Sequence, residues 1–319
     1  MNPSIRETTT RDAYGSALLD VGRENPLIVA VDADLSKCTM SCKFAKEFPL
    51  RFFNLGVSEQ DIMGTAAGLA VAGKIPFVST FAVFASGRAY DQIRVSIAYS
   101  GLNVKVVGSH GGIGVGEDGP THHAIEDIAL MRAMPGMTVI CPSDGISAYR
   151  ATEAVAAFIG PVYLRTTRNK LKPVYDLDYE FKLGKADVLM SSDNDSVTIV
   201  STGIMASFAK DACENLKKKG INVRLINMQT VKPLDTAVLL KAAKETKGIV
   251  TCEDHSIIGG LGGAVAEFLS EHYPTKVVRV GVNDMFTESG TATELYKKYG
   301  LDADGIEKAV MKIVSTNSN

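Results

Sequence analysis

Residues 110–123 read His-Gly-Gly-Ile-Gly-Val-Gly-Glu-Asp-Gly-Pro-Thr-His-His, and this loop joins an apolar run at 104–107 to a segment with helical periodicity at 124–133. A buried strand, a loop and a helix in this order are typical of a parallel α/β sheet. Glycines let the backbone turn and approach a ligand, whereas histidine and aspartate supply hydrogen bonds and proton-transfer groups near neutral pH. The stretch therefore predicts an α/β fold with a loop that surrounds a small polar substrate.

The same alternation extends in both directions from this loop. Further strands are expected at 27–31, 77–80, 138–141 and 162–165, with helices at 12–21, 59–72, 88–99 and 145–158. After a pause with a proline and several charges, strands are expected at 197–201, 223–226, 248–251 and 277–280, with helices at 207–218, 235–246, 263–272 and 293–299. We expect an α/β protein of two domains: residues 1–170 with a parallel sheet and helices on both faces, a linker at 171–190, and a smaller α/β domain at 191–319.

Composition excludes several classes of protein. The 319 residues are 45% hydrophobic and 22% charged with a net charge of −2, so we expect a globular core and no nucleic-acid or membrane partner. The N-terminal residues lack the apolar core of a signal peptide, and the five cysteines are scattered, which favours reduced thiols in the cytoplasm. Cys38 and Cys42 form a close pair, but no second pair or suitably spaced histidines complete a zinc site.

A carboxylate stands at the start of the helix expected at 59–72. Ser58 can act as N-cap, with Asp61 three residues later, so Glu59 occupies the first helical position. A favourable charge at the positive end of the helix dipole is one explanation for Glu59. The helix is apolar or small on nearly every side, however, which predicts burial, and a buried carboxylate needs a partner. A ligand nitrogen that shares the proton of Glu59 would meet that need.

Three other motifs leave alternatives open. Phe81 and Phe84 could flank a flat heterocycle or pack in the core. Residues 114–119 match the dinucleotide-binding spacing of glycines, but Glu117 and Asp118 would repel a pyrophosphate there. The glycines at 259–263 open a helix and could bind an anion, although close packing of the helix on a sheet is the commoner role.

Taken together, these motifs give the chain a family resemblance. It resembles, over essentially its whole length, the C-terminal half of transketolase as found where that enzyme is split into two polypeptides. The segments that carry the resemblance are 32–35 (Asp-Ala-Asp-Leu), 56–59 (Gly-Val-Ser-Glu), 79–84 with its two phenylalanines, and the loop at 110–122.

The resemblance implies thiamine diphosphate as cofactor and transfer of a two-carbon ketol unit from a ketose phosphate to an aldose phosphate. Glu59 would contact the aminopyrimidine nitrogen and take part in catalysis. Phe81 and Phe84 would line the pyrimidine pocket, and Asp34 would lie near the cofactor. The protein's task would be to orient and tune the cofactor.

The resemblance also implies a set of sugar-binding residues. His110 and His122 would contact the sugar and act in catalysis, and Asp118 would bind an acceptor hydroxyl. Arg168 would hold the sugar phosphate, with Arg11 as a second candidate, because an arginine can donate two parallel hydrogen bonds to a phosphate.

Half of the expected site has no counterpart in this sequence. Members of the family hold the diphosphate and its Mg²⁺ (or Ca²⁺) through a Gly-Asp-Gly motif, which does not occur in this sequence. We therefore assign no metal ligand to this chain and expect a partner, an N-terminal transketolase subunit, to supply the diphosphate half. A dimer of heterodimers with active sites between chains is the natural assembly.

Departures from the family pattern leave other functions open. Cys38 stands where a phosphate-contacting serine is usual, and Gly87 where an aromatic residue often extends the ring pocket. Residues 88–92 (Arg-Ala-Tyr-Asp-Gln) look like deoxyxylulose-phosphate synthase, a thiamine relative. The alternatives are that enzyme type, the β subunit of a 2-oxoacid dehydrogenase, a nicotinamide dehydrogenase, and a non-catalytic regulatory subunit. The sequence does not identify the donor and acceptor sugars.

Overall fold

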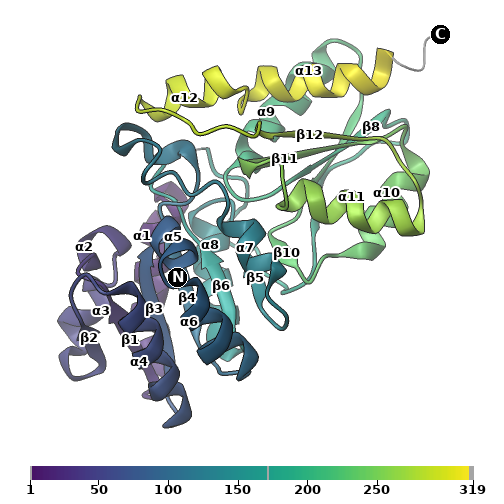
Figure 1. Cartoon of the computed structure of the whole chain (residues 1–319). Coiled ribbons are helices and arrows are strands. Elements are labelled where there is room, and N and C mark those ends of the chain that lie inside the picture. Colours follow the sequence, from purple (N-terminus) through teal and green to yellow (C-terminus); the bar gives the residue numbers. More distant parts are fainter. Residues whose placement is uncertain (1, 171, 316–319) are drawn as a thin grey trace.

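The computed structural model describes residues 2–170 and 172–315 and contains two β-sheets, each with helices on both faces (Figure 1). The α/β fold class expected from the sequence is confirmed. In the described residues, no helix combines the length and apolar character needed to cross a membrane.

The first sheet has seven strands in the order β10-β5-β6-β4-β3-β1-β2. All neighbouring strands run parallel except β10, which is antiparallel to β5. The strands are β1 (Ile28–Asp32), β2 (Phe52–Asn54), β3 (Ile75–Phe81), β4 (Lys105–Ser109), β5 (Thr138–Ile140), β6 (Val162–Arg165) and β10 (Thr230–Lys232).

The side chains of these strands point alternately to the two faces of the sheet and form a hydrophobic core on each face. Phe77 and Val107 pack on one face against α1 (Thr10–Glu24) and α8 (Gly145–Ala157). Their neighbours Val78 and Val106 pack on the other face against α4 (Glu59–Val71), α5 (Ala82–Gly87) and α7 (Asp127–Ala133). Successive side chains of a strand point to opposite faces, so continuous apolar runs are buried on both sides.

Some helices differ from their expected form. The helix expected at 88–99 is a short α6 (Tyr90–Gln92) followed by a π-helical segment, Ile93–Tyr99. Two short helices, α2 (Ser36–Thr39) and α3 (Cys42–Glu47), occupy the connection from β1 to β2.

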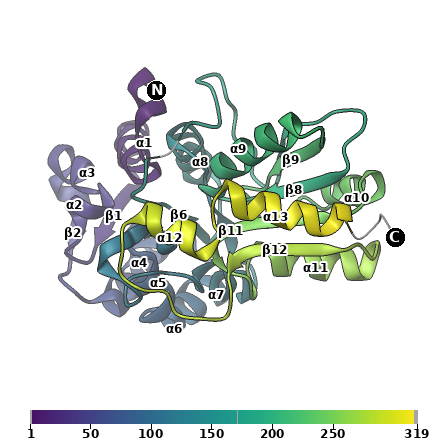
Figure 2. The same ribbon diagram turned by 90° about the horizontal axis from the view of Figure 1, so that it is seen from above.

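The second sheet has five strands in the order β12-β11-β8-β9-β7, parallel except for β7 against β9. Its strands are β7 (Asp187–Met190), β8 (Val197–Ser201), β9 (Val223–Asn227), β11 (Ile249–Ser256) and β12 (Val277–Val282). Two helices, α9 (Met205–Lys218) and α13 (Ala303–Val314), cover one face, and two others, α10 (Thr236–Glu245) and α11 (Leu261–His272), cover the opposite face. A further helix, α12 (Ala292–Tyr299), reaches over the first domain (Figure 2).

The elements that the sequence did not predict include β7, β10 and α13. β7 lies inside the segment assigned to the linker at 171–190, of which Leu171 is outside the described residues. β10 follows β9 in the chain but joins the first sheet, where Val231 packs in the core. Both strands are short edge strands whose pairing depends on distant residues, so local pattern does not reveal them. α13 did have a local signal, since Ile306, Val310 and Ile313 are spaced as on one helix face.

Candidate functional site

Glu59 stands at the N-terminal end of α4, in an open depression lined also by Ser58, Gln60, Asp61 and Arg88. Glu59 is 6% exposed, and its Oε1 accepts a hydrogen bond from Arg88 Nη1 at 3.0 Å. Ser58 occupies the N-cap position, but its hydroxyl donates to the Leu55 carbonyl instead of accepting from the helix, so the expected capping interaction is wrong. The partner of the buried carboxylate in the free chain is therefore Arg88.

Aromatic rings gather next to this carboxylate. Phe81 ends β3 and Phe84 lies in α5, with ring centroids 5.6 Å apart and planes at 15°. Arg88 lies over the Phe84 ring at 4.0 Å from the centroid. His110 stacks on Phe81 at 4.0 Å, and His122 meets Phe84 edge-on at 5.3 Å. The fold thus brings together residues from four separate segments that the sequence singled out.

His110 is held in a specific orientation and charge state. Its φ of +60° is uncommon for a residue other than glycine and is often found at functional sites. Arg11 Nη1 donates to Nε2 at 3.1 Å, so Nδ1 carries the hydrogen and donates to Ser109 Oγ at 2.8 Å. Burial, followed by the positive charge of Arg11, lowers the pKa of His110 to about 3, which keeps the ring neutral.

Arg11 also connects His110 to the position of the unusual cysteine. The same Nη1 atom donates to the Cys38 carbonyl at 3.1 Å. Arg11 is therefore not an ordinary surface charge, because it links α1, the α2 segment and the glycine-rich loop.

The far end of the loop carries a second charged group. Arg168 lies 3.4 Å from Glu117 and 3.7 Å from Asp118, measured between guanidinium nitrogens and carboxylate oxygens. All three side chains are partly exposed, and the positive charge of Arg168 contributes to lowering the His110 pKa. Asp118 and Arg168 therefore lie together near the histidines.

Asp34 makes its hydrogen bonds to Asn54. It adopts a φ of +63° after β1, and its backbone N–H donates to Asn54 Oδ1 at 3.0 Å. The preceding Asp32 is buried and accepts hydrogen bonds from Leu35, Thr39 and Ser41, and burial raises its pKa. Asp32 thus has a structural role in the turn, while the hydrogen bonds of Asp34 go to Asn54 and not to the rings.

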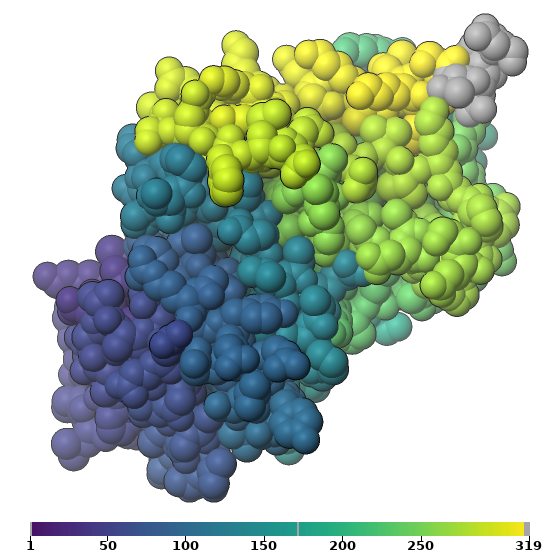
Figure 3. Space-filling model, in the orientation of Figure 1, coloured from purple at the N-terminus to yellow at the C-terminus, as the bar shows by residue number. Residues whose placement is uncertain are grey.

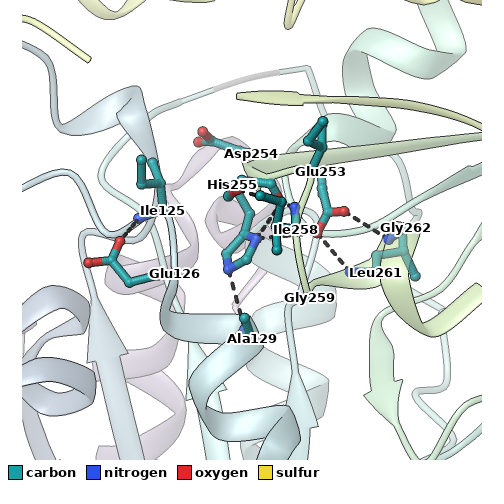
Figure 4. A network of polar contacts seen from close by, with 12 residues as sticks. Ile125, Glu126, Ala129, Glu253, Asp254, His255, Ile258, Gly259, Leu261 and Gly262 are labelled. Carbon is teal, nitrogen blue, oxygen red and sulfur yellow. Dashed lines mark hydrogen bonds and ion pairs between the residues drawn. The ribbon is translucent and has the colours of Figure 1, made fainter. Parts of the chain in front are cut away.

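The glycine-rich helix start at 259–263 is occupied by the protein itself. The Glu253 carboxylate accepts the backbone N–H groups of Leu261 at 2.7 Å and Gly262 at 2.8 Å (Figure 4). A Cβ on Gly260 would lie 2.0 Å from Glu253 Oε2, so glycine allows this approach. Close packing, and not anion binding, explains these glycines.

Sequence reasoning did not single out the residues at the end of β11. Glu253, Asp254 and His255 are consecutive and buried, and they follow an apolar run in the same strand. Three polar residues in sequence at the end of a buried strand are a signal that could have marked them, because buried polar groups need partners.

The described part of the chain offers no ready-made metal site. No group of three His, Cys, Asp or Glu side chains there is arranged to hold a metal ion. Cys38 and Cys42 are free, partly exposed thiols.

Comparison with known proteins places this geometry in a family. Residues 6–173 match the family "Transketolase, pyrimidine binding domain", and residues 184–306 match "Transketolase, C-terminal domain". A putative transketolase C-terminal section from Methanocaldococcus jannaschii is 47% identical over 95% of both chains. The 6-deoxy-6-sulfo-D-fructose transketolase subunit SqwH from a Clostridium species is 42% identical over 97% of this chain and 95% of its own length.

A solved structure agrees with these relatives. The structure described as "Split gene transketolase, inactive beta4 tetramer" superposes with a TM-score of 0.90 at 49% identity, covering 97% of this chain and 99% of that one. The resemblance drawn from residues 32–35, 56–59, 79–84 and 110–122 is confirmed. The chain belongs to the transketolase family and is a subunit of the split type that corresponds to the C-terminal section of the enzyme.

Proposed function

We propose that this chain is the catalytic half of a transketolase that receives the pyrimidine ring of thiamine diphosphate and the sugar substrates. The assembled enzyme would transfer a two-carbon ketol unit from a ketose phosphate to an aldose phosphate. The supporting observation is the convergence of Glu59, the two phenylalanines and the two histidines beyond the carboxyl ends of β3 and β4. Ligands of parallel α/β sheets bind in this position.

The residues present fit the pyrimidine end of the cofactor. A carboxylate that is 6% exposed can take a hydrogen bond from a ring nitrogen, and the Phe81 and Phe84 rings offer flat apolar surfaces beside it. When bound, thiamine diphosphate supplies the electron sink for carbon–carbon bond cleavage. Glu59 would hold the pyrimidine proton, and Arg88, which now pairs with Glu59, would keep that carboxylate aimed into the depression. Asp34 is proposed as a further cofactor contact because β1 lies next to β3 in the sheet.

The sugar would lie along the glycine-rich loop. His110 and His122 would donate and accept hydrogen bonds at the sugar hydroxyls and carbonyl, and Asp118 would accept from an acceptor hydroxyl. His110 is suited to this role because it is neutral and held by Arg11. Arg168 is partly exposed and paired at 3.4 Å or longer, so a phosphate could replace its carboxylate partners.

A partner chain would complete the site. The described residues contain no group of three His, Cys, Asp or Glu side chains arranged to hold a metal ion, and the similar chains carry the names "C-terminal section" and "subunit". The solved relative is described as an inactive tetramer of β chains, which supports dependence on a different partner. We propose an N-terminal transketolase subunit as that partner, a dimer of heterodimers as the assembly, and a cytoplasmic location.

Glu59→Gln in the enzyme reconstituted with its partner tests this function. The change keeps the shape of the side chain but removes its charge, and kcat should fall by about 10²–10⁴-fold, the range of a lost acid–base group. Glu24→Gln is the matched control, since it makes the same chemical change at an exposed carboxylate at the end of α1, outside this depression. The assay is aldose release from xylulose 5-phosphate, with pyruvate decarboxylation as the competing activity. Equal rates for both variants, or turnover of pyruvate alone, would refute the proposal.

A further inference from the structure

The glycine-rich loop belongs to the first domain in sequence but is packed into the second. Ile113 is fully buried in the core cluster of the second domain, together with Val250 and Tyr296. Ile125, just after the loop, packs in the same cluster. In Figure 3 the yellow-green segment before and within α12 lies directly on the teal segment that contains the loop. The second domain therefore supplies part of the surface on which the loop rests.

Asp254 holds the backbone of this loop. Its Oδ1 accepts the N–H of Ile113 at 2.9 Å, and its Oδ2 accepts the hydroxyl of Tyr296 at 3.0 Å. A Cβ on Gly112 would lie 2.0 Å from Asp254 Oδ2, and one on Gly114 would lie 2.2 Å from the Tyr296 hydroxyl. Two of the glycines thus permit contact with the second domain.

A second contact holds the end of the loop. His123 Nε2 donates to the Gly116 carbonyl at 3.0 Å, so its Nδ1 accepts from the Thr287 hydroxyl at 2.5 Å. Thr287 lies between β12 and α12 and is buried. The segment that carries Asp118 and His122 is therefore fixed from the same side as Ile113.

The neighbours of Asp254 anchor it on both sides. Glu253 caps the start of α11, while His255 Nε2 accepts the N–H of Ala129 in α7 at 3.3 Å (Figure 4). Arg165 Nη2 from β6 donates to the Asp254 carbonyl at 2.9 Å. The end of β11 therefore makes hydrogen bonds to both domains, so it can couple the position of one domain to that of the other.

We propose that the second domain sets the sugar affinity of the site, with Asp254 and Tyr296, and with Thr287 acting through His123, as positioning residues. They act through the loop backbone, which presents His110, Asp118 and His122 to the substrate. The inference rests on the proposed transketolase function. It adds a role for the second domain that requires no contact between that domain and the substrate.

The first test measures amide hydrogen exchange in the chain alone. Tyr296→Phe removes the hydroxyl that pairs with Asp254 but keeps the ring in the core. Exchange at 111–119 should become about tenfold faster, as expected for a weakened local hydrogen-bond network, while exchange at 59–71 stays the same. Tyr299→Phe is the control, because it makes the same chemical change in the same helix. Thr287→Val tests the second contact independently. Unchanged exchange in both Tyr296→Phe and Thr287→Val overturns the proposal.

The second test measures kinetics in the enzyme assembled with its partner. Tyr296→Phe should raise KM for the sugar phosphates by about five- to tenfold, the effect of roughly one misplaced hydrogen bond, with the Kd for thiamine diphosphate unchanged. Faster exchange with an unchanged KM overturns the proposal. A variant that loses thermal stability, cofactor binding and turnover together also overturns it. An assembled wild-type enzyme that binds thiamine diphosphate but transfers no ketol unit rejects the proposed function. The exchange data then still decide whether the second domain holds the loop.

Discussion

The most strongly determined prediction concerns the buried ion pair between Asp127 and Arg165. Arg165 Nε and Nη2 donate to the two Asp127 oxygens at 2.7 and 3.1 Å, and Tyr163 donates its hydroxyl at 2.8 Å. Arg165 Nη2 also donates to the carbonyls of Ala124 and Asp254 at 2.9 Å. Both charged side chains are 3% exposed or less. Asp127→Asn removes the carboxylate charge that pairs directly with the buried guanidinium and turns an amide N–H toward these donors.

The expected cost follows from this burial. Removing one partner of a buried pair costs about 3–5 kcal/mol. An unfolding entropy of about 2.1 cal/mol/K per residue corresponds to ~0.7 kcal/mol/K for the 319-residue chain. The two values predict that Tm falls by about 4–7 °C.

Thermal unfolding of the isolated chain, followed by calorimetry, measures this shift. Glu153→Gln is the control because it breaks the partly exposed Arg150–Glu153 pair, which should cost less than about 1 kcal/mol. Adding Arg165→Gln to Asp127→Asn should cost little more, since the charge left alone is then removed. Equal Tm values for Asp127→Asn and Glu153→Gln would refute the reasoning.

Two further predictions concern the site. Because burial lowers the folded-state pKa of His110 to about 3, the unfolded chain binds its proton first as pH falls, and stability is lost progressively from about pH 6.5 toward pH 3. His110→Asn is a suitable variant because asparagine tolerates the positive φ. Between about pH 7.5 and 5.5, the free energy of unfolding, measured with denaturant, should fall by about 1.4 kcal/mol less in the variant than in the wild type. An equal fall in both proteins would contradict the neutral buried ring. Arg168→Ala should raise KM for phosphorylated sugars by about 10–100-fold but not for their unphosphorylated analogues, the effect of losing hydrogen bonds to a charged group. Lys170→Ala, an exposed cation two residues away, should leave both KM values unchanged, and a similar effect of the two changes would argue against a specific phosphate contact.

Part of the site was predicted from the sequence, and part was not. Glu59 and the loop at 110–122 were found because their residue types and spacing are local, and the family resemblance assigned them roles. The pairing of Glu59 with Arg88 was missed, since it depends on how α6, just after Arg88, packs beside α4. The contact of Arg11 with His110 joins residues 99 positions apart and follows from the packing of α1 beside the end of β4.

The sequence by itself determined the buried strands, most helices, the two-domain order and the family. These follow from apolar periodicity and from motifs whose residues are neighbours in the chain. Tertiary structure alone decided that β10 joins the first sheet, that β7 joins the second, and that Asp254 holds the N–H of Ile113 from 141 positions away. Such contacts satisfy buried polar groups and sheet edges, and those requirements are met by whichever residues the whole fold brings within reach.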